Sequence, residues 1–139
     1  MPASYQIFYD LNLVFVRYVG AVTTEESVEN FLAYLMSGQA RPGRSIFIDF
    51  SECVSVLIDF EDMVAMVAEK LGLLDPYEAT MVTAMYAPDE HVRAVCLEYQ
   101  RLVSNSDKQM LGVFDTRKDA LAFLKIEPSH FPAGLLGAD

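Results

Sequence analysis

Residues 45–71, SIFIDFSECVSVLIDFEDMVAMVAEKL, contain the pattern that decides the fold. The first six residues form an almost continuous apolar run, which is typical of a parallel strand buried on both faces. A short polar segment follows, and after Asp59 the apolar residues recur at helical spacing. Asp59, Glu61 and Asp62 suit a helix N-terminus, where carboxylates cap free N–H groups and interact favourably with the helix dipole. The stretch therefore predicts a strand, a polar loop and a helix.

The helix that begins near Asp59 is predicted to bury one apolar stripe, because residues three and four positions apart share a helix face. The predicted inner stripe consists of Phe60, Met63, Val64, Val67 and Leu71. Met66 falls beside Asp62, Glu69 and Lys70 in this arrangement and is predicted to be exposed on the outer face.

Similar patterns occur on both sides of this unit. Two β-prone runs, residues 5–9 and 13–19, are separated by the turn-forming residues Asp10 and Asn12 and predict a hairpin. A Thr-x-x-Glu capping box begins at Thr23. The other elements are predicted at residues 24–37 (helix), 79–87 (strand), 89–103 (helix), 109–114 (strand) and 116–124 (helix).

The predicted order is β-β-α-β-α-β-α-β-α, which indicates an α/β fold with a five-stranded, mixed but mostly parallel sheet and four helices. The first strand is expected to run antiparallel at an edge. Neighbouring residues such as Phe47 and Ile48 point to opposite faces of the sheet, so both faces need apolar cover. Helices on both faces would supply it, and so would helices on one face and a second copy of the chain on the other.

Length and charge limit the class of protein. A chain of 139 residues is one domain by default, and we expect this domain to span residues 1–126. Residues 127–139 contain two prolines and two glycines and are expected to form an irregular tail. The formal net charge of −10 opposes binding to nucleic acid and to anionic membrane surfaces.

The sequence predicts a cytoplasmic protein. No signal peptide opens it, and no apolar run approaches the 18 residues expected of a membrane span. The two cysteines, Cys53 and Cys96, lack metal-ligand spacing and fit a reducing compartment. Cys96 falls on an apolar helix face, whereas Cys53 follows a strand and is predicted to be accessible.

Motifs for catalysis and cofactor binding are absent from the sequence. It contains no G-x-S-x-G, G-x-x-x-x-G-K-[ST], G-x-G-x-x-G or H-E-x-x-H. We therefore expect no enzyme activity, no cofactor and no metal site. The remaining alternatives are an enzyme that uses Asp59, Glu61 or His91, and a hard cation bound by the carboxylates of Asp59, Glu61 and Asp62.

Ligands of open α/β sheets bind near the carboxyl ends of the strands, so the predicted loop and helix start form the candidate site. The candidate partner-binding residues are Ser51, Glu52, Ser55, Asp59, Phe60, Glu61, Asp62 and Met66. A second hypothesis comes from the methionines Met63, Met66, Met81, Met85 and Met110, which cluster around predicted core elements. Ordinary packing explains them, and so does an apolar ligand cavity between helices and sheet.

The same unit resembles the STAS domains of anti-sigma-factor antagonists. In that family a strand ends in Asp-Leu-Ser, and Asp-Ser-Ser-Gly opens the next helix; here Asp49-Phe50-Ser51 and Asp59 stand at these positions. The segments LVFVRYVGAVTTEE and GVFDTRKDALAFL resemble the start and the end of the SpoIIAA-like (STAS/Sec14-like) group of small stand-alone proteins. The resemblance covers roughly residues 5–125 and implies a SpoIIAA-like fold.

The resemblance implies a non-enzymatic regulatory or interaction domain that binds a protein partner through residues 51–66. The similarity of the group to Sec14-type lipid-binding folds implies the alternative, a carrier or sensor of a small apolar ligand or lipid. The family's phosphorylated Ser would follow Asp59, but Phe60 and Glu61 stand there and Asp62 replaces the Gly. The phosphorylation switch is therefore not carried over. Glu61 as a permanent phosphate mimic is a further hypothesis, which unchanged partner binding by Glu61→Ser would contradict.

Overall fold

The computed structural model describes residues 3–37, 43–77 and 80–131. In this part of the chain the strands are β1 (Ala3–Phe8), β2 (Leu13–Thr23), β3 (Ser45–Leu57), β4 (Met81–Tyr86) and β5 (Gln109–Phe114). They lie side by side in the order β1-β2-β3-β4-β5. β1 pairs antiparallel with β2, and the other neighbours pair parallel. The predicted mixed sheet with an antiparallel edge strand is confirmed.

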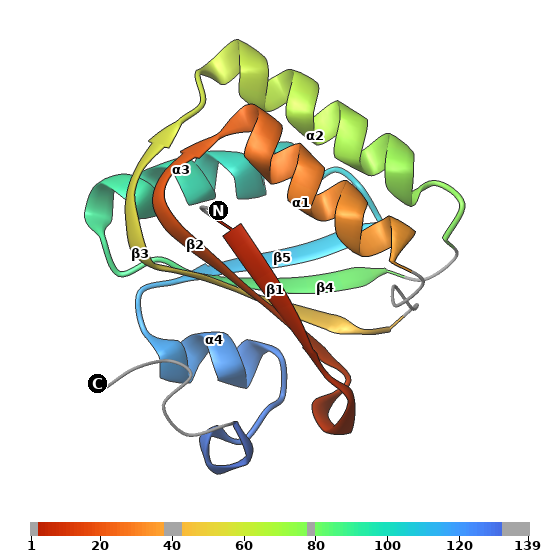
Figure 1. Ribbon diagram of the computed structural model, residues 1–139, viewed down its shortest axis with the longest axis vertical. Helices are drawn as coiled ribbons and strands as arrows, with labels where there is room; N and C mark the ends of the chain where they lie inside the picture. Colours follow the sequence, from red (N-terminus) through yellow and green to blue (C-terminus); the bar gives the residue numbers. More distant parts are fainter. Residues whose placement is uncertain (1–2, 38–42, 78–79, 132–139) are drawn as a thin grey trace.

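Four α-helices connect and cover the strands within the described ranges. They are α1 (Thr24–Met36), α2 (Phe60–Leu74), α3 (Glu90–Val103) and α4 (Arg117–Phe123), with short 3₁₀ turns at Tyr9–Leu11 and Pro128–His130. Figure 1 shows α1, α2 and α3 over one face of the sheet and α4 on the opposite face. Helices thus cover both faces, which was one of the two predicted arrangements. No helix in the described residues has the length and apolar character that crossing a membrane requires.

The sheet separates two apolar clusters. The larger one lies under α1, α2 and α3, and the smaller one lies under α4. In the smaller cluster, Phe47 from β3 stacks on Phe15 from β2, with ring centroids 5.6 Å apart. Phe131, which follows the second 3₁₀ turn, is buried against the same two rings. The C-terminal segment therefore contributes to the core of this face, and a second copy of the chain is not required to bury these residues.

The start of α1 follows the predicted capping box. The Thr23 hydroxyl accepts a hydrogen bond from the Glu26 N–H at 3.3 Å, and the Glu26 carboxylate accepts one from the Thr23 N–H at 3.4 Å. Two N–H groups that lack partners within the helix are satisfied in this way. The box joins the last residue of β2 directly to the helix.

Thr23→Ala is expected to lower the free energy of unfolding by about 1 kcal/mol, because one N–H group of the first turn loses its acceptor. Chemical denaturation monitored by circular dichroism measures this change. Thr24→Ala, at the next position, removes the same atoms outside the cap and is the matched control. Equal effects of the two substitutions would show that the cap contributes nothing.

The buried face of α2 differs from the predicted stripe. The buried residues are Met63, Met66, Val67, Lys70 and Leu74. Phe60 and Val64 are exposed, so their assignment to the inner face is wrong, as is the assignment of Met66 to the outer face. The difference arises because Lys70, predicted to face outward, lies on the same helix face as Met63 and Met66, and this face packs against the rest of the protein.

Candidate functional site

The polar segment predicted as a loop is part of a strand. β3 continues to Leu57, and residues 52–57 pair with residues 19–23 of β2. The prediction of a loop after Phe50 is therefore wrong. Val54 and Val56 favour extended backbone because their branched side chains pack well on a pleated surface. The pairing shifts register between Arg17 and Val19 and again between Gly20 and Ala21, as at β-bulges. Figure 1 shows the two strand ends bending towards the starts of α1 and α2.

The eight candidate partner-binding residues do not share one surface. Met66 is 3% exposed and faces the core, so it is out of reach of a partner. Asp59 caps α2 as predicted, since its carboxylate accepts a hydrogen bond from the Asp62 N–H at 2.8 Å. Ser51, Glu52, Asp59, Phe60, Glu61 and Asp62 are exposed, and Ser55 is half-buried. Cys53, predicted to be accessible, is buried.

Large apolar side chains are exposed among these acids. They belong to Val54, Leu57, Phe60 and Val64, with exposed fractions between 42% and 76%. We call these four residues the β3–α2 apolar row. It runs from the end of β3 into the first turns of α2 and lies in the same segment as Asp59 and Asp62. Exposed apolar side chains in one segment with charged ones make that segment a candidate contact surface.

Asp49 stands at the position of the first acidic motif of the resembled family. Its contacts are structural. It is fully buried, and its Oδ2 accepts hydrogen bonds from Arg17 Nε at 3.1 Å and Nη2 at 2.9 Å. Its Oδ1 accepts a hydrogen bond from the Ser51 N–H at 2.8 Å. The Arg17 guanidinium also lies 3.6 Å from Glu52. Asp49 therefore links β2 to β3 at the point where the pairing changes register.

The residues of the enzyme hypothesis lie on different elements. His91 is exposed in the first turn of α3, which Asp89 caps by accepting a hydrogen bond from the Val92 N–H at 2.9 Å. Asp59 and Glu61 belong to the start of α2. Within the described part of the chain, no three His, Cys, Asp or Glu side chains gather into a group that could hold a metal ion.

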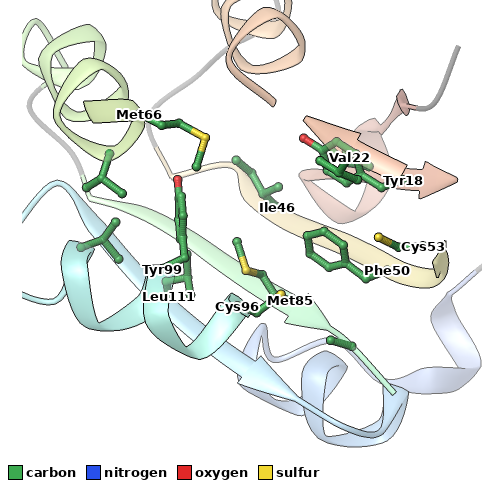
Figure 2. Packing of buried hydrophobic residues seen from close by; sticks show 14 of the residues in the cluster. Tyr18, Val22, Ile46, Phe50, Cys53, Met66, Met85, Cys96, Tyr99 and Leu111 are labelled. Atoms are coloured by element: carbon green, nitrogen blue, oxygen red, sulfur yellow. The ribbon is translucent and has the colours of Figure 1, made fainter. Parts of the chain in front are cut away.

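A cavity lies between the sheet and helices α1, α2 and α3. It offers about 70 Å³ to the centre of a water-sized sphere. Its walls are mostly apolar and include Phe50 from β3, Met85 from β4, Met63 and Met66 from α2, and Cys96 from α3. Figure 2 shows Met66 extending from α2 beside the ring of Tyr99, with Phe50 and Met85 on the strands below them. Three of the methionines in the cavity hypothesis thus line it.

Lys70 is a charged residue in the cavity wall. It is only 7% exposed, and its Nζ donates a hydrogen bond to the Ser27 hydroxyl on α1 at 2.7 Å. The ammonium also lies 5.4 Å from the ring centroid of Phe31 and 5.1 Å from that of Tyr99, within the range of cation–π attraction. The ion pairs of the described residues include no carboxylate at Lys70. The buried ammonium is therefore stabilised by one hydroxyl group and two aromatic rings.

Burial shifts the acid–base properties of the groups around this cavity. Loss of hydration lowers the pKa of Lys70 from 10.5 to about 8. Burial also raises the pKa of the Cys96 thiol to about 12 and raises the pKa of the Tyr99 hydroxyl. The pKa of Tyr18 is raised mainly by burial, with hydrogen bonds to Ser27 and Asn30 acting in the opposite direction. Lys70 is therefore the group among these that titrates closest to neutral pH.

Lys70→Met is expected to change the pH dependence of stability. Between pH 8 and 10.5 the unfolded wild type binds a proton that the folded wild type does not, so the stability of the wild type rises with pH relative to the variant. The free energy of unfolding of the wild type, relative to that of the variant, should rise by about 3 kcal/mol across this interval. Denaturation at a series of pH values measures the difference, and the exposed Lys118→Met serves as control. Parallel curves for the wild type and Lys70→Met would contradict the lowered pKa.

Two further polar atoms of the cavity lining have no hydrogen-bond partner among the described residues. They are the hydroxyl oxygen of Thr83 on β4 and the side-chain carbonyl oxygen of Gln109 on β5. Gln109 also forms a side-chain hydrogen bond with Tyr99. Buried polar atoms normally have a partner, from the protein or from an ordered water molecule. The cavity therefore combines apolar walls with three polar side chains that can make further bonds.

The chain is similar in structure to proteins whose structures have been solved. An uncharacterized protein of the DUF3478 family from Shewanella loihica PV-4, described as having a SpoIIAA-like fold, superposes with a TM-score of 0.53 at 21% identity. The match covers 88% of this chain and 93% of the other. The fold is SpoIIAA-like. The anti-sigma factor antagonist SpoIIAA in its unphosphorylated form also matches, with a TM-score of 0.45 and 13% identity over 88% of this chain and 98% of the other. No protein-family model and no curated protein matches the sequence.

Lys70 is the residue of the cavity that the sequence analysis did not identify. A signal for it exists, because Met63, Met66, Val67 and Lys70 follow the i, i+3, i+4, i+7 spacing of one helix face. The prediction of an outward-facing charge at Lys70 conflicts with this pattern, and the incorrect prediction for Met66 follows from it.

Proposed function

We propose that this SpoIIAA-like domain is a carrier or sensor that binds one small, mainly apolar molecule between helices α1–α3 and the sheet. The observation that supports the proposal is the cavity with methionine walls. Unbranched methionine side chains adapt to guests of different shape and so suit a ligand site. The domain would act by binding, without catalysis. A cytoplasmic location belongs to the same proposal, since Cys53 and Cys96 are both free thiols.

A titration with the neutral probe 1-hexanol tests this function. In protein labelled with ¹³C at the methionine methyl groups, we expect saturable chemical-shift changes at Met63, Met66 and Met85. Met36 and Met110 are exposed and do not line the cavity, so they are internal controls within the same sample. Equal and unsaturated shifts at all five methyl groups, or none at all, would refute a binding cavity.

A second function, binding of a protein partner, is favoured by the β3–α2 apolar row. Its exposed Leu57 and Phe60 lie in one segment with Asp59, Glu61 and Asp62. Such a surface suits a partner that offers apolar side chains surrounded by basic residues. The missing hydroxyl after Asp59 would leave this contact independent of phosphorylation. A second copy of the chain is the other candidate partner.

Substitutions in the row test the second function. Phe60→Ser with Val64→Ser is expected to abolish capture of a partner from cell lysate, and Asp59→Lys with Asp62→Lys is expected to do the same. Leu97→Ser changes a similarly exposed apolar residue on α3 and is the control. Light scattering on a sizing column reports self-association. If capture of a partner survives both double substitutions, that partner does not bind this surface.

A further inference from the structure

We infer that the cavity selects small apolar carboxylates, with the carboxylate bound to the Lys70 ammonium and the apolar body among Met63, Met66 and Met85. This inference rests on the proposed ligand-binding function and adds the chemical class of the ligand. It assigns Lys70 as the residue that determines specificity.

The Lys70 ammonium has unused hydrogen-bonding capacity. It carries three N–H donors, and one is directed to Ser27. The aromatic rings of Phe31 and Tyr99 stabilise positive charge but accept no strong hydrogen bond. A carboxylate oxygen would accept the remaining donors and form a charge-assisted pair. An apolar alcohol would fill the same space without neutralising the charge.

The charge balance of the cavity favours an anionic guest. A buried charge is stabilised when it is paired, and the described part of the chain supplies no carboxylate to Lys70. The other ionisable groups near the site, Tyr18, Tyr99, Cys53 and Cys96, have raised pKa values and are neutral at pH 7. The net charge of −10 opposes the approach of anions, but its exposed charges are screened by salt and act mainly on association rates.

The size of the cavity limits the ligand. The centre of a water-sized sphere can occupy about 70 Å³ of the cavity, which corresponds to about five water molecules. Five water molecules fill roughly 150 Å³ of liquid, and an apolar cavity of that size accommodates benzene. The apolar parts of hexanoate and benzoate, a five-carbon chain and one ring, are close to benzene in size, whereas a long-chain lipid is much larger. The Thr83 hydroxyl and the Gln109 carbonyl, both buried without partners, mark where a water molecule or a hydroxyl on the ligand would bind.

Calorimetric titration of the wild type with hexanoate and with 1-hexanol at pH 7 tests the inference. We expect hexanoate to bind at least about tenfold more tightly, in line with the strength of charge-assisted bonds. Lys70→Met should remove this preference, so that the variant binds hexanoate no more tightly than hexanol. Lys118→Met, an exposed substitution on α4 at the opposite face of the sheet, should behave as the wild type.

The outcomes separate the two proposals. Equal affinities of the wild type for hexanoate and hexanol would overturn the role of Lys70 and leave the cavity function intact. Binding of neither probe would overturn both. Retention of the hexanoate preference in Lys70→Met would assign the preference to another residue and refute the inference.

A pH series on the wild type provides a test that needs no substitution. Hexanoate affinity should fall about tenfold between pH 7 and pH 9 as Lys70 loses its proton, while hexanol affinity stays constant. The cysteines and tyrosines around the site have raised pKa values and start from their neutral form, so Lys70 is the cation lost over this range. Hexanoate binding that is independent of pH would contradict the assignment.

Discussion

Phe47→Ala is expected to lower the free energy of unfolding by about 3–5 kcal/mol, because the substitution removes a large buried ring and leaves a cavity. Phe47 is fully buried at the centre of the sheet. Its ring lies 5.6 Å from that of Phe15, 6.4 Å from that of Tyr86 and 5.8 Å from that of Phe131. Chemical denaturation followed by tyrosine fluorescence and circular dichroism measures the loss.

Val54→Ala is the control for Phe47→Ala, since it lies on the same strand and is 76% exposed. We expect a change of no more than about 0.5 kcal/mol there, as for other surface positions. A double-mutant cycle of Phe47→Ala with Phe131→Ala should give a coupling energy of about 0.5–1.5 kcal/mol for the aromatic pair. An effect of Phe47→Ala below 1 kcal/mol would mean that the face under α4 is not a packed core.

Asp49→Ala is expected to cost about 3 kcal/mol of stability, the second large effect. The substitution leaves the Arg17 guanidinium, whose side chain is 25% exposed, without its two bonds to Oδ2. It also removes the acceptor of the Ser51 N–H. Removing one partner of a buried pair is costly because the other charge stays desolvated. Thermal and urea denaturation at pH 7 measure the loss.

Glu52→Ala tests whether the loss belongs to the buried pair. Glu52 is exposed and lies 3.6 Å from Arg17, so its removal should change stability by no more than about 0.5 kcal/mol. The double substitution Arg17→Met with Asp49→Leu removes both charges and should recover part of the loss. If Asp49→Ala and Glu52→Ala have equal effects, Asp49 does not act as the buried link between β2 and β3.

Tertiary contacts account for the incorrect predictions at the candidate site. The segment 51–57 contains serine and glutamate, which are typical of a loop, but β2 pairs with five of its seven residues across two register shifts. Cys53 is buried by the same pairing, because alternate residues of a strand face opposite sides. The start of α2 was predictable, since Asp59 caps the helix through a bond to a residue three positions away.

The sequence by itself determined the order of the elements and where each helix begins, because capping and periodicity act between residues a few positions apart. It also determined that both faces of the sheet would be buried. Only the tertiary structure decided how far β3 extends, which face of α2 is buried and that Lys70 lies in a cavity. These features depend on residues brought together from distant parts of the chain, such as Ser27 with Lys70, whose separation of 43 positions no local pattern records. The contacts that stabilise them form only when β2 pairs with β3 and when α1, α2 and α3 pack on the sheet.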